Sequence, residues 1–210
     1  MMMSKDILYL GSQSRARQRL LDYAGIRYKV LTHQSSEECE QQNKPFDEYV
    51  LAIAQSKMQA LVLPPRTEID TDYLFVVTAD TLVRNPRTDQ VLAKPNDRQH
   101  AIAMLTEERG GPIEVMTGCC LEKFQYINGS WSVTDKAHWA MSAMVEFYVD
   151  KESVNRYLEI FPFALHCSGA GVVEDHGLSY LKSVQGSYTA VIGLPLYELR
   201  QKLASMKFRF

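Results

Sequence analysis

The sequence predicts a mixed α/β protein, and three observations support that prediction. Short apolar runs rich in β-branched and aromatic residues alternate with segments whose apolar residues recur every three to four positions. The 210 residues, 46% of them hydrophobic, can build a substantial core, as one large domain or as two small lobes. The sequence contains no internal repeat, low-complexity segment or clear linker. We therefore expect a mixed sheet accompanied by helices.

The first part of the chain predicts a strand, a loop of small residues and a helix. Residues 7–10 are apolar, residues 11–14 read Gly-Ser-Gln-Ser, and a helix is expected over residues 15–23. A second strand is expected over residues 27–31. A longer helix is expected over residues 45–63, because apolar side chains recur there near a period of 3.6 and two prolines follow.

The central stretch is an apolar strand that runs into polar residues. Residues 75–77 predict a buried strand that ends at residues 78–81, Thr-Ala-Asp-Thr, and an acid at a strand end can face a cleft. Turn residues within segment 82–95 predict that it folds back as a hairpin. That return would bring Lys94 near Asp80.

The second half of the chain predicts a long hairpin and three more helices. The two strands are expected over residues 113–126 and 131–149, and Asn128-Gly129 between them is a strong hairpin signal. The helices are expected over residues 97–108, over residues 151–161, and from Gly193-Leu194-Pro195 onward.

Charge and cysteine content exclude several classes of protein. A net charge of −2 argues against broad binding to nucleic acid or to a membrane surface. No run approaches the roughly 20 apolar residues that span a bilayer, and the start lacks the apolar region of a signal peptide, so we expect a cytoplasmic protein. The four cysteines show no C-x-x-C spacing, which favours reduced thiols over a zinc site.

Two groups of residues are candidates for chemistry on a phosphate. The carboxylate of Asp80 could hold a cation or activate water, and the ammonium of Lys94 could neutralise phosphate oxygens. Alternatively, Asp80 is an acid in a turn and Lys94 an unrelated surface lysine. Ser12, Ser14 and Arg17 at a helix start could grip a phosphate together with backbone N–H groups. Alternatively, Ser14 only caps the helix and Arg17 is solvated.

With these segments identified, the chain resembles the Maf family of nucleotide pyrophosphatases over nearly its whole length. Several separated motifs occur in the family's order: residues 7–21 are similar to its S-x-S-P-R-R loop and helix, 54–57 to A-x-x-K, 79–81 to A-D-T, 93–95 to G-K-P, 115–118 to V-x-T-G, and 186–196 to its C-terminal signature. The resemblance implies an elongated α/β fold of the inosine-triphosphatase-like type, with a twisted mixed sheet and a cleft between two lobes of a single domain over residues 1–210. It also implies hydrolysis of a nucleoside triphosphate to the monophosphate and pyrophosphate with Mg²⁺ or Mn²⁺. Family members often dimerise, so a homodimer is a possible assembly.

Matched position by position, the resemblance assigns roles to individual side chains. Asp80 corresponds to the family's proton-accepting acid, which would also hold the metal together with Glu37. The remaining matches are to phosphate-binding positions, which are Ser12, Ser14, Arg17, Lys57 and Lys94.

The chain departs from the family pattern at three positions. Ala16 replaces the first arginine of the loop's pair, Ser36 replaces the aspartate before Glu37, and Gly171 replaces an aromatic residue. Arg15 stands where the loop has proline and could supply the missing guanidinium from a shifted position. These losses keep a second reading open, in which the chain is a regulatory protein that binds nucleotide and turns it over slowly or not at all.

The three positions that match the family's specificity sites indicate different bases. Ala16 fits neither branch of the family, Thr81 resembles the dTTP/UTP branch, and Glu174 resembles the 7-methyl-GTP branch. An ionised carboxylate only accepts hydrogen bonds, which suits the N–H donors of guanine and the positive charge of N7 methylation. On that ground we expect 7-methyl-GTP as the preferred substrate, with dTTP or UTP as the alternative.

Overall fold

The structure of the protein is a computed structural model that describes residues 6–32, 44–108 and 111–210. Its strands are β1 Leu8–Leu10, β2 Tyr28–Val30, β3 Tyr73–Asn85, β4 Gln90–Leu92, β5 Ile113–Ile127, β6 Ser130–Phe147 and β7 Leu181–Gly186. Its α-helices are α1 Arg15–Tyr23, α2 Phe46–Gln59, α3 Arg98–Ala103, α4 Val154–Ile160, α5 Tyr188–Ile192 and α6 Leu196–Ser205. Five short helices of other types are η1 Arg66–Glu68, η2 Met104–Glu108, η3 Pro162–His166, η4 Ser168–Ala170 and η5 Asp175–Tyr180.

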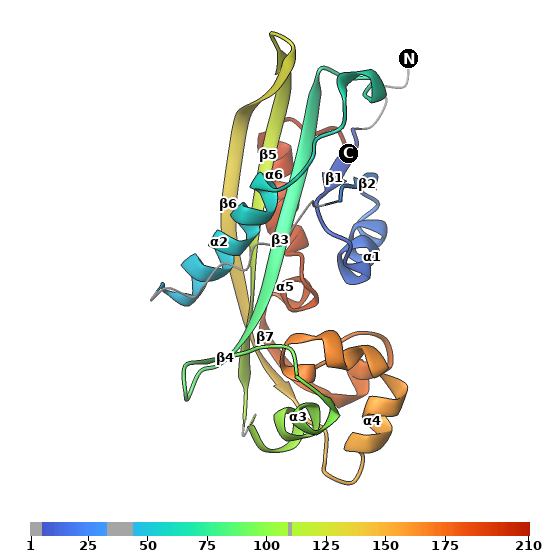
Figure 1. The fold of residues 1–210 in the computed structure, drawn as a ribbon, viewed down its shortest axis with the longest axis vertical. Helices are drawn as coiled ribbons and strands as arrows, with labels where there is room; N and C mark the ends of the chain where they lie inside the picture. The colour runs from blue at the N-terminus through green and yellow to red at the C-terminus, as the bar shows by residue number, and fades with distance from the viewer. Residues whose placement is uncertain (1–5, 33–43, 109–110) are drawn as a thin grey trace. The chain divides into compact units, whose positions relative to one another are not determined.

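The strands form one seven-stranded mixed sheet, which confirms the predicted α/β class (Figure 1). The order is β2-β1-β3-β5-β6-β7, and β4 pairs with β3 outside this series. β1 is parallel to both β2 and β3, with Leu8 opposite Tyr28 and Phe75. β4 and β7 are antiparallel to their partners. The β3–β4 pairing confirms the predicted hairpin.

Most predicted elements occur near the predicted positions. The helix predicted over residues 97–108 is α-helical only over Arg98–Ala103 and continues as the π-helix η2, and β7 and α5 were not predicted. Two further differences concern β3 and α2. β3 does not end at Thr78 but continues to Asn85, so Asp80 lies inside a strand and not at its end. α2 ends at Gln59, four residues before the predicted end, and Leu61 beyond it packs against Gly11, where an added Cβ atom would lie 2.7 Å from the Leu61 side chain. The hairpin turn is as predicted, with positive φ angles at Asn128 (53°) and Gly129 (87°).

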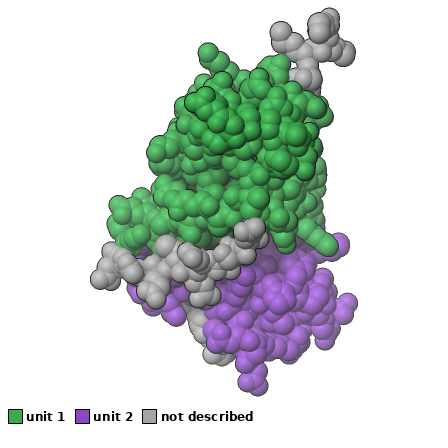
Figure 2. Space-filling view, turned by 45° about the horizontal axis from the view of Figure 1, so that its top comes forward, with its two compact units in different colours: residues 1–80, 117–141, 193–210 green, residues 81–116, 142–192 purple. Residues whose placement is uncertain are grey.

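The chain divides into two compact units, shown in different colours in Figure 2. Unit 1 comprises residues 1–80, 117–141 and 193–210, and unit 2 comprises residues 81–116 and 142–192. The organisation as a single domain with a cleft between two lobes stays a prediction of the sequence. No helix in the described part of the chain is long and apolar enough to cross a membrane.

Each unit has its own hydrophobic core. In unit 1, Tyr9, Ala54 and Val76 belong to a cluster between α2 and the sheet. In unit 2, the fully buried Tyr157 of α4 is central: its hydroxyl donates to the carbonyl of Ala170 at 3.1 Å and accepts from the N–H of Val172 at 2.8 Å. Tyr157 therefore satisfies its polar atom without leaving the core.

Candidate functional site

Lys57 of α2 and Asp80 of β3 form an ion pair in unit 1. The Nζ atom of Lys57 lies 2.5 Å from Oδ1 of Asp80, and the two side chains are 30% and 16% exposed. The pair lies off the buried stripe of the helix, which Val50, Ala54 and Met58 form. An ammonium has three donors and a carboxylate has several acceptor positions, so both groups can bind a ligand while they stay paired. In the sequence, only the match of residues 54–57 to the family's A-x-x-K motif indicates that Lys57 is a site residue.

Two contacts hold α2 against the sheet close to this ion pair. The hydroxyl of Thr78, which is fully buried two residues before Asp80, donates to the carbonyl of Ala54 at 2.7 Å. On β5, a Cβ atom at Gly118 would lie 2.8 Å from backbone atoms of Val50, so only glycine allows this approach. Thr78 was not among the predicted site residues, although a threonine between apolar strand residues is a signal for a buried hydrogen bond.

Arg17 is buried in α1 and is bound by other parts of unit 1. Its Nε donates to the carbonyl of Gly193 at 2.8 Å, and a terminal nitrogen donates to Oγ of Ser12 at 3.0 Å. Burial lowers the pKa of Arg17, and the charges of Asp80 and Cys119 act in the opposite direction. The idea that Arg17 is a solvated side chain is therefore wrong. Gly193, a ligand of this guanidinium, was seen in the sequence only as a helix-opening residue.

The loop before α1 organises itself around its two serines. Ser14 is the N-cap of α1 and accepts from the N–H of Arg17 at 3.4 Å, while Ser12 accepts from the N–H of Ser14 at 3.2 Å. Each hydroxyl still has its own proton to donate, so capping and phosphate binding are compatible. Next to them, Ala16 is half-buried and Arg15 is exposed.

Thr81, Lys94 and Glu174 belong to unit 2. Lys94 is exposed after β4, Thr81 follows Asp80 in β3, and Glu174 is half-buried at the start of η5. Burial raises the pKa of the Cys167 thiol, the charge of Glu174 raises it further, and that of Lys94 lowers it. Lys94 and Glu174 thus lie within electrostatic reach of the same thiol, which argues against a Glu174 that only faces solvent.

The predicted site residues therefore fall into two groups, one in each unit. Their assembly into one site, including the approach of Lys94 to Asp80, stays a prediction. Glu37 and Ser36 lie outside the described residues. No group of three or more His, Cys, Asp or Glu side chains within the described ranges could hold a metal ion. The three cysteines in those ranges are free thiols.

The family model described as "Maf-like protein" matches residues 7–206 of the chain. The chain belongs to the Maf-like family. Among curated Maf-like relatives, a protein named dTTP/UTP pyrophosphatase from Cupriavidus pinatubonensis is 29% identical over 211 residues, which cover 98% of this chain and 99% of the relative. Proteins with the same name from Shigella sonnei and Escherichia coli K12 are 31% and 30% identical over 198 residues, covering 94% of this chain and 92% of each relative. These names do not support the expected preference for 7-methyl-GTP and fit the alternative of dTTP or UTP.

Proposed function

We propose that the protein is a nucleoside triphosphate pyrophosphatase that hydrolyses dTTP and UTP to the monophosphate and pyrophosphate. Membership of the Maf-like family and the names of its relatives support the reaction class. The observation that carries the proposal is the contact between Lys57 and Asp80, because it joins the two motifs that match the family's lysine and acid at 2.5 Å.

The proposed reaction cleaves the bond between the α-phosphorus and the oxygen that bridges to the β-phosphate. Asp80 accepts a proton from the attacking water, whose oxygen becomes bonded to the α-phosphorus, and the bridging oxygen leaves with pyrophosphate. Lys57 and Lys94 bind phosphate oxygens and stabilise the charge that develops on them. The hydroxyl groups of Ser12 and Ser14 donate hydrogen bonds to oxygens of the same phosphate chain.

A divalent cation fits the donor that Asp80 offers. Mg²⁺ binds through one or two carboxylates together with substrate phosphates and retains several waters, so the single, mostly buried carboxylate of Asp80 suits it. Asp80 would hold the ion, and the ion would neutralise phosphate charge. The participation of Glu37 is part of the same proposal.

The base preference rests on Thr81 and on the relatives. Thr81 matches the dTTP/UTP branch, and its hydroxyl can both donate and accept, as the alternating edge of uracil or thymine requires. Glu174 is the residue that disagrees with this assignment, because a carboxylate can only accept. A test of base preference must therefore include guanine nucleotides.

A second candidate function is a regulatory protein that binds nucleotide with little turnover. The departures from the family motif at Ala16 and Gly171 favour it, because both positions lack the side chain that the family has there. Ala16 supplies no second guanidinium. In this case the protein would bind triphosphates without releasing pyrophosphate.

Pyrophosphate release from dTTP, UTP, CTP, GTP and 7-methyl-GTP, with Mg²⁺ or with a chelator, tests the proposal. We expect release from dTTP and UTP that the chelator abolishes. Asp80→Asn should lower turnover by roughly 10²–10⁴-fold, the usual contribution of a positioned base, while the variant stays folded, as a thermal melt checks. Asp135→Asn, at an exposed position of β6, is the control and should keep full activity. Binding of dTTP by calorimetry without release from any nucleotide would favour the regulatory reading, and equal activity in Asp80→Asn would remove Asp80 from the mechanism.

A further inference from the structure

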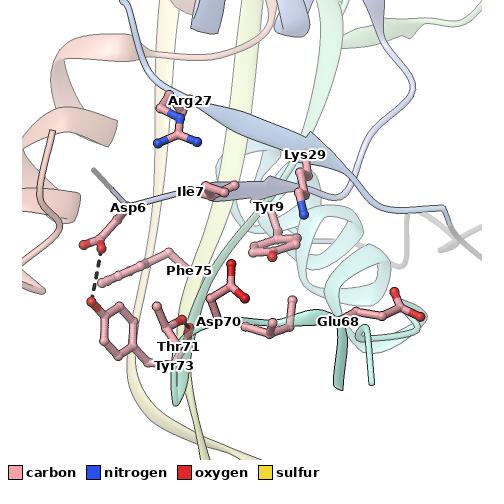
Figure 3. A pocket seen from close by; sticks show the side chains of 11 residues that line it. Asp6, Ile7, Tyr9, Arg27, Lys29, Glu68, Asp70, Thr71, Tyr73 and Phe75 are labelled. Carbon is pink, nitrogen blue, oxygen red and sulfur yellow. Dashed lines mark hydrogen bonds between the residues drawn. The ribbon is translucent and has the colours of Figure 1, made fainter. Parts of the chain in front are cut away.

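Unit 1 contains a pocket of about 140 Å³ that includes none of the predicted site residues (Figure 3). It lies at the amino ends of the parallel strands. Asp6 and Ile7 directly precede β1, Arg27 directly precedes β2, and Tyr73 is the first residue of β3. The loop of Ser12 and Ser14 and the side chain of Asp80 lie further along the same strands in the carboxyl direction. The pocket is therefore separate from the proposed catalytic site.

The walls of the pocket carry opposite charges. Lys29 belongs to β2 and Arg27 directly precedes it, and Glu68 and Asp70 come from η1 and the segment after it. Neither Lys29 nor Asp70 has an ion-pair or hydrogen-bond partner among the described residues. Because Lys29 and Asp70 are not paired with each other, one ligand can contact both of these opposite charges.

The pocket also has apolar side chains and hydroxyl groups in its lining. Ile7 is half-buried and contributes apolar surface, and the buried side chains of Ile69 and Phe75 also line the pocket. Tyr9 is only 6% exposed, and Figure 3 shows the Asp70 carboxylate turned toward its ring. Burial and the charges of Asp70 and Glu68 raise the pKa of Tyr9, so its hydroxyl stays protonated and can donate a hydrogen bond at neutral pH.

Asp6, the remaining acid of the pocket, is already neutralised. It forms an ion pair with Arg209 at 2.6 Å and accepts a hydrogen bond from Tyr73 at 3.1 Å. A ligand in the pocket therefore meets charges of both signs, from Lys29 on one wall and from Asp70 on the other. Asp70 and Glu68 would repel a phosphate, and Lys29 and Arg27 would repel an amine. A ligand that carries charge of only one sign is therefore disfavoured.

We propose that this pocket binds a free α-amino acid with an apolar side chain, its ammonium on Asp70, its carboxylate on Lys29 and its side chain on Ile7. The volume is too small for a nucleotide, because pockets for drug-sized ligands measure roughly 300–1,000 Å³. A zwitterion is the class of small molecule that satisfies both walls at once. Charge-assisted hydrogen bonds at each end fix its orientation.

Calorimetric titration of the full chain with L-leucine tests the proposal on the unmodified protein. Two truncated analogues keep the same side chain: 4-methylpentanoate lacks the ammonium and isopentylamine lacks the carboxylate. We expect L-leucine to bind and each analogue to bind about ten-fold more weakly or worse. Absence of leucine binding up to about 10 mM, or an analogue or inorganic phosphate that binds as well as leucine, would overturn the zwitterion site.

Variants locate the binding within the pocket. Lys29→Gln and Asp70→Asn should each raise the Kd for L-leucine by about ten-fold. Both variants should melt like the parent protein, because both side chains are exposed and neither is paired with another described residue. Lys202→Gln and Asp135→Asn remove the same charges at exposed positions outside the pocket and should leave the Kd unchanged. Leucine binding that neither pocket variant weakens would place the ligand elsewhere and refute the proposal.

Discussion

At the scale of single residues, the side chains of the proposed phosphate site are already engaged with one another. Lys57 contacts Asp80, and Arg17 contacts Ser12 and Gly193. These contacts hold the donors in fixed positions before a ligand binds. Preorganised donors lose little side-chain entropy on binding, which is how a fixed polar environment stabilises developing charge.

Arg17 provides the sharpest prediction at this scale. Arg17→Lys keeps the charge but replaces a planar fork with a single ammonium, which cannot reach both the Gly193 carbonyl and Ser12 in the same geometry. We expect the free energy of unfolding to fall by roughly 1–3 kcal/mol, because a buried acceptor loses its partner. Urea denaturation followed by circular dichroism measures it.

Arg15→Lys is the matched control for that experiment. Arg15 lies two positions away in the same helix and is exposed, so the substitution should change stability by less than about 0.5 kcal/mol. Equal effects of the two substitutions would show that the contacts of Arg17 contribute no stability of their own.

At the scale of elements, the position of α2 on the sheet determines where Lys57 lies relative to Asp80. The hydrogen bond from Thr78 to Ala54 connects β3 to the helix one turn before Lys57, and Gly118 lets the helix backbone approach β5 closely. A shift of the helix would move the ammonium away from the carboxylate. Such a shift alters catalysis more than stability.

Thr78→Val tests this connection, since valine has the same shape but no hydroxyl. If the proposed function holds, we expect kcat to fall by about three- to ten-fold, and the protein should lose about 1 kcal/mol of stability. Thr78→Ser keeps the hydroxyl and should retain most of kcat even where it loses packing. A valine variant that is less stable but fully active would limit Thr78 to a structural role.

Periodicity predicted most of the elements, and its errors have physical causes. α1 lies over Arg15–Tyr23 as predicted, and the Asn128-Gly129 turn joins β5 to β6. The continuation of β3 was missed because Thr78 and Asp80 looked like the polar end of a strand, whereas both find partners on α2. The pairing of Lys57 with Asp80 depends on tertiary packing, which single-sequence periodicity does not encode.

At the scale of the whole molecule, the chain passes between the two units four times. Three of these passages, after Asp80, Met116 and Met141, fall within β3, β5 and β6. A boundary inside a strand has no Pro- or Gly-rich linker, which explains why composition predicted no division of the chain. For the same reason, the residues of both site groups could be predicted from the sequence, but the arrangement of one group relative to the other could not.

The pH dependence of stability should reflect Asp6, which connects the first strand to the chain's last residues. Burial raises the pKa of Asp6, but hydrogen bonds from Arg209 and Tyr73 and the charge of Arg209 outweigh it, so the pKa lies below its ordinary value. A carboxyl whose pKa is lower in the folded state stabilises the fold above its unfolded pKa, and this stabilisation is lost as the pH falls through the folded pKa. The protein should therefore become less stable at acidic pH.

Asp6→Asn should reduce this acid dependence. We expect a loss of roughly 1–3 kcal/mol at pH 7 and a smaller difference from the parent protein as the pH falls below about 4. Melting temperatures of both proteins between pH 3 and pH 7 measure the difference, with Asp135→Asn as an exposed control. Parallel curves for the Asp6→Asn protein and its parent would show that Asp6 does not contribute to the pH dependence.

The same contact brings the backbone at Asp6 next to the backbone at Arg209. The N–H of Asp6 donates to the carbonyl of Arg209 at 2.9 Å, and the N–H of Arg209 donates to Oδ2 of Asp6 at 2.8 Å. A circular permutation could thus connect the present ends through a short linker and open the chain at Asn128-Gly129, where the turn is exposed. In such a permuted protein the two longest strands would become the terminal ones, while the loop of Ser12, the helix of Lys57 and the strand of Asp80 would keep their order in the interior of the sequence.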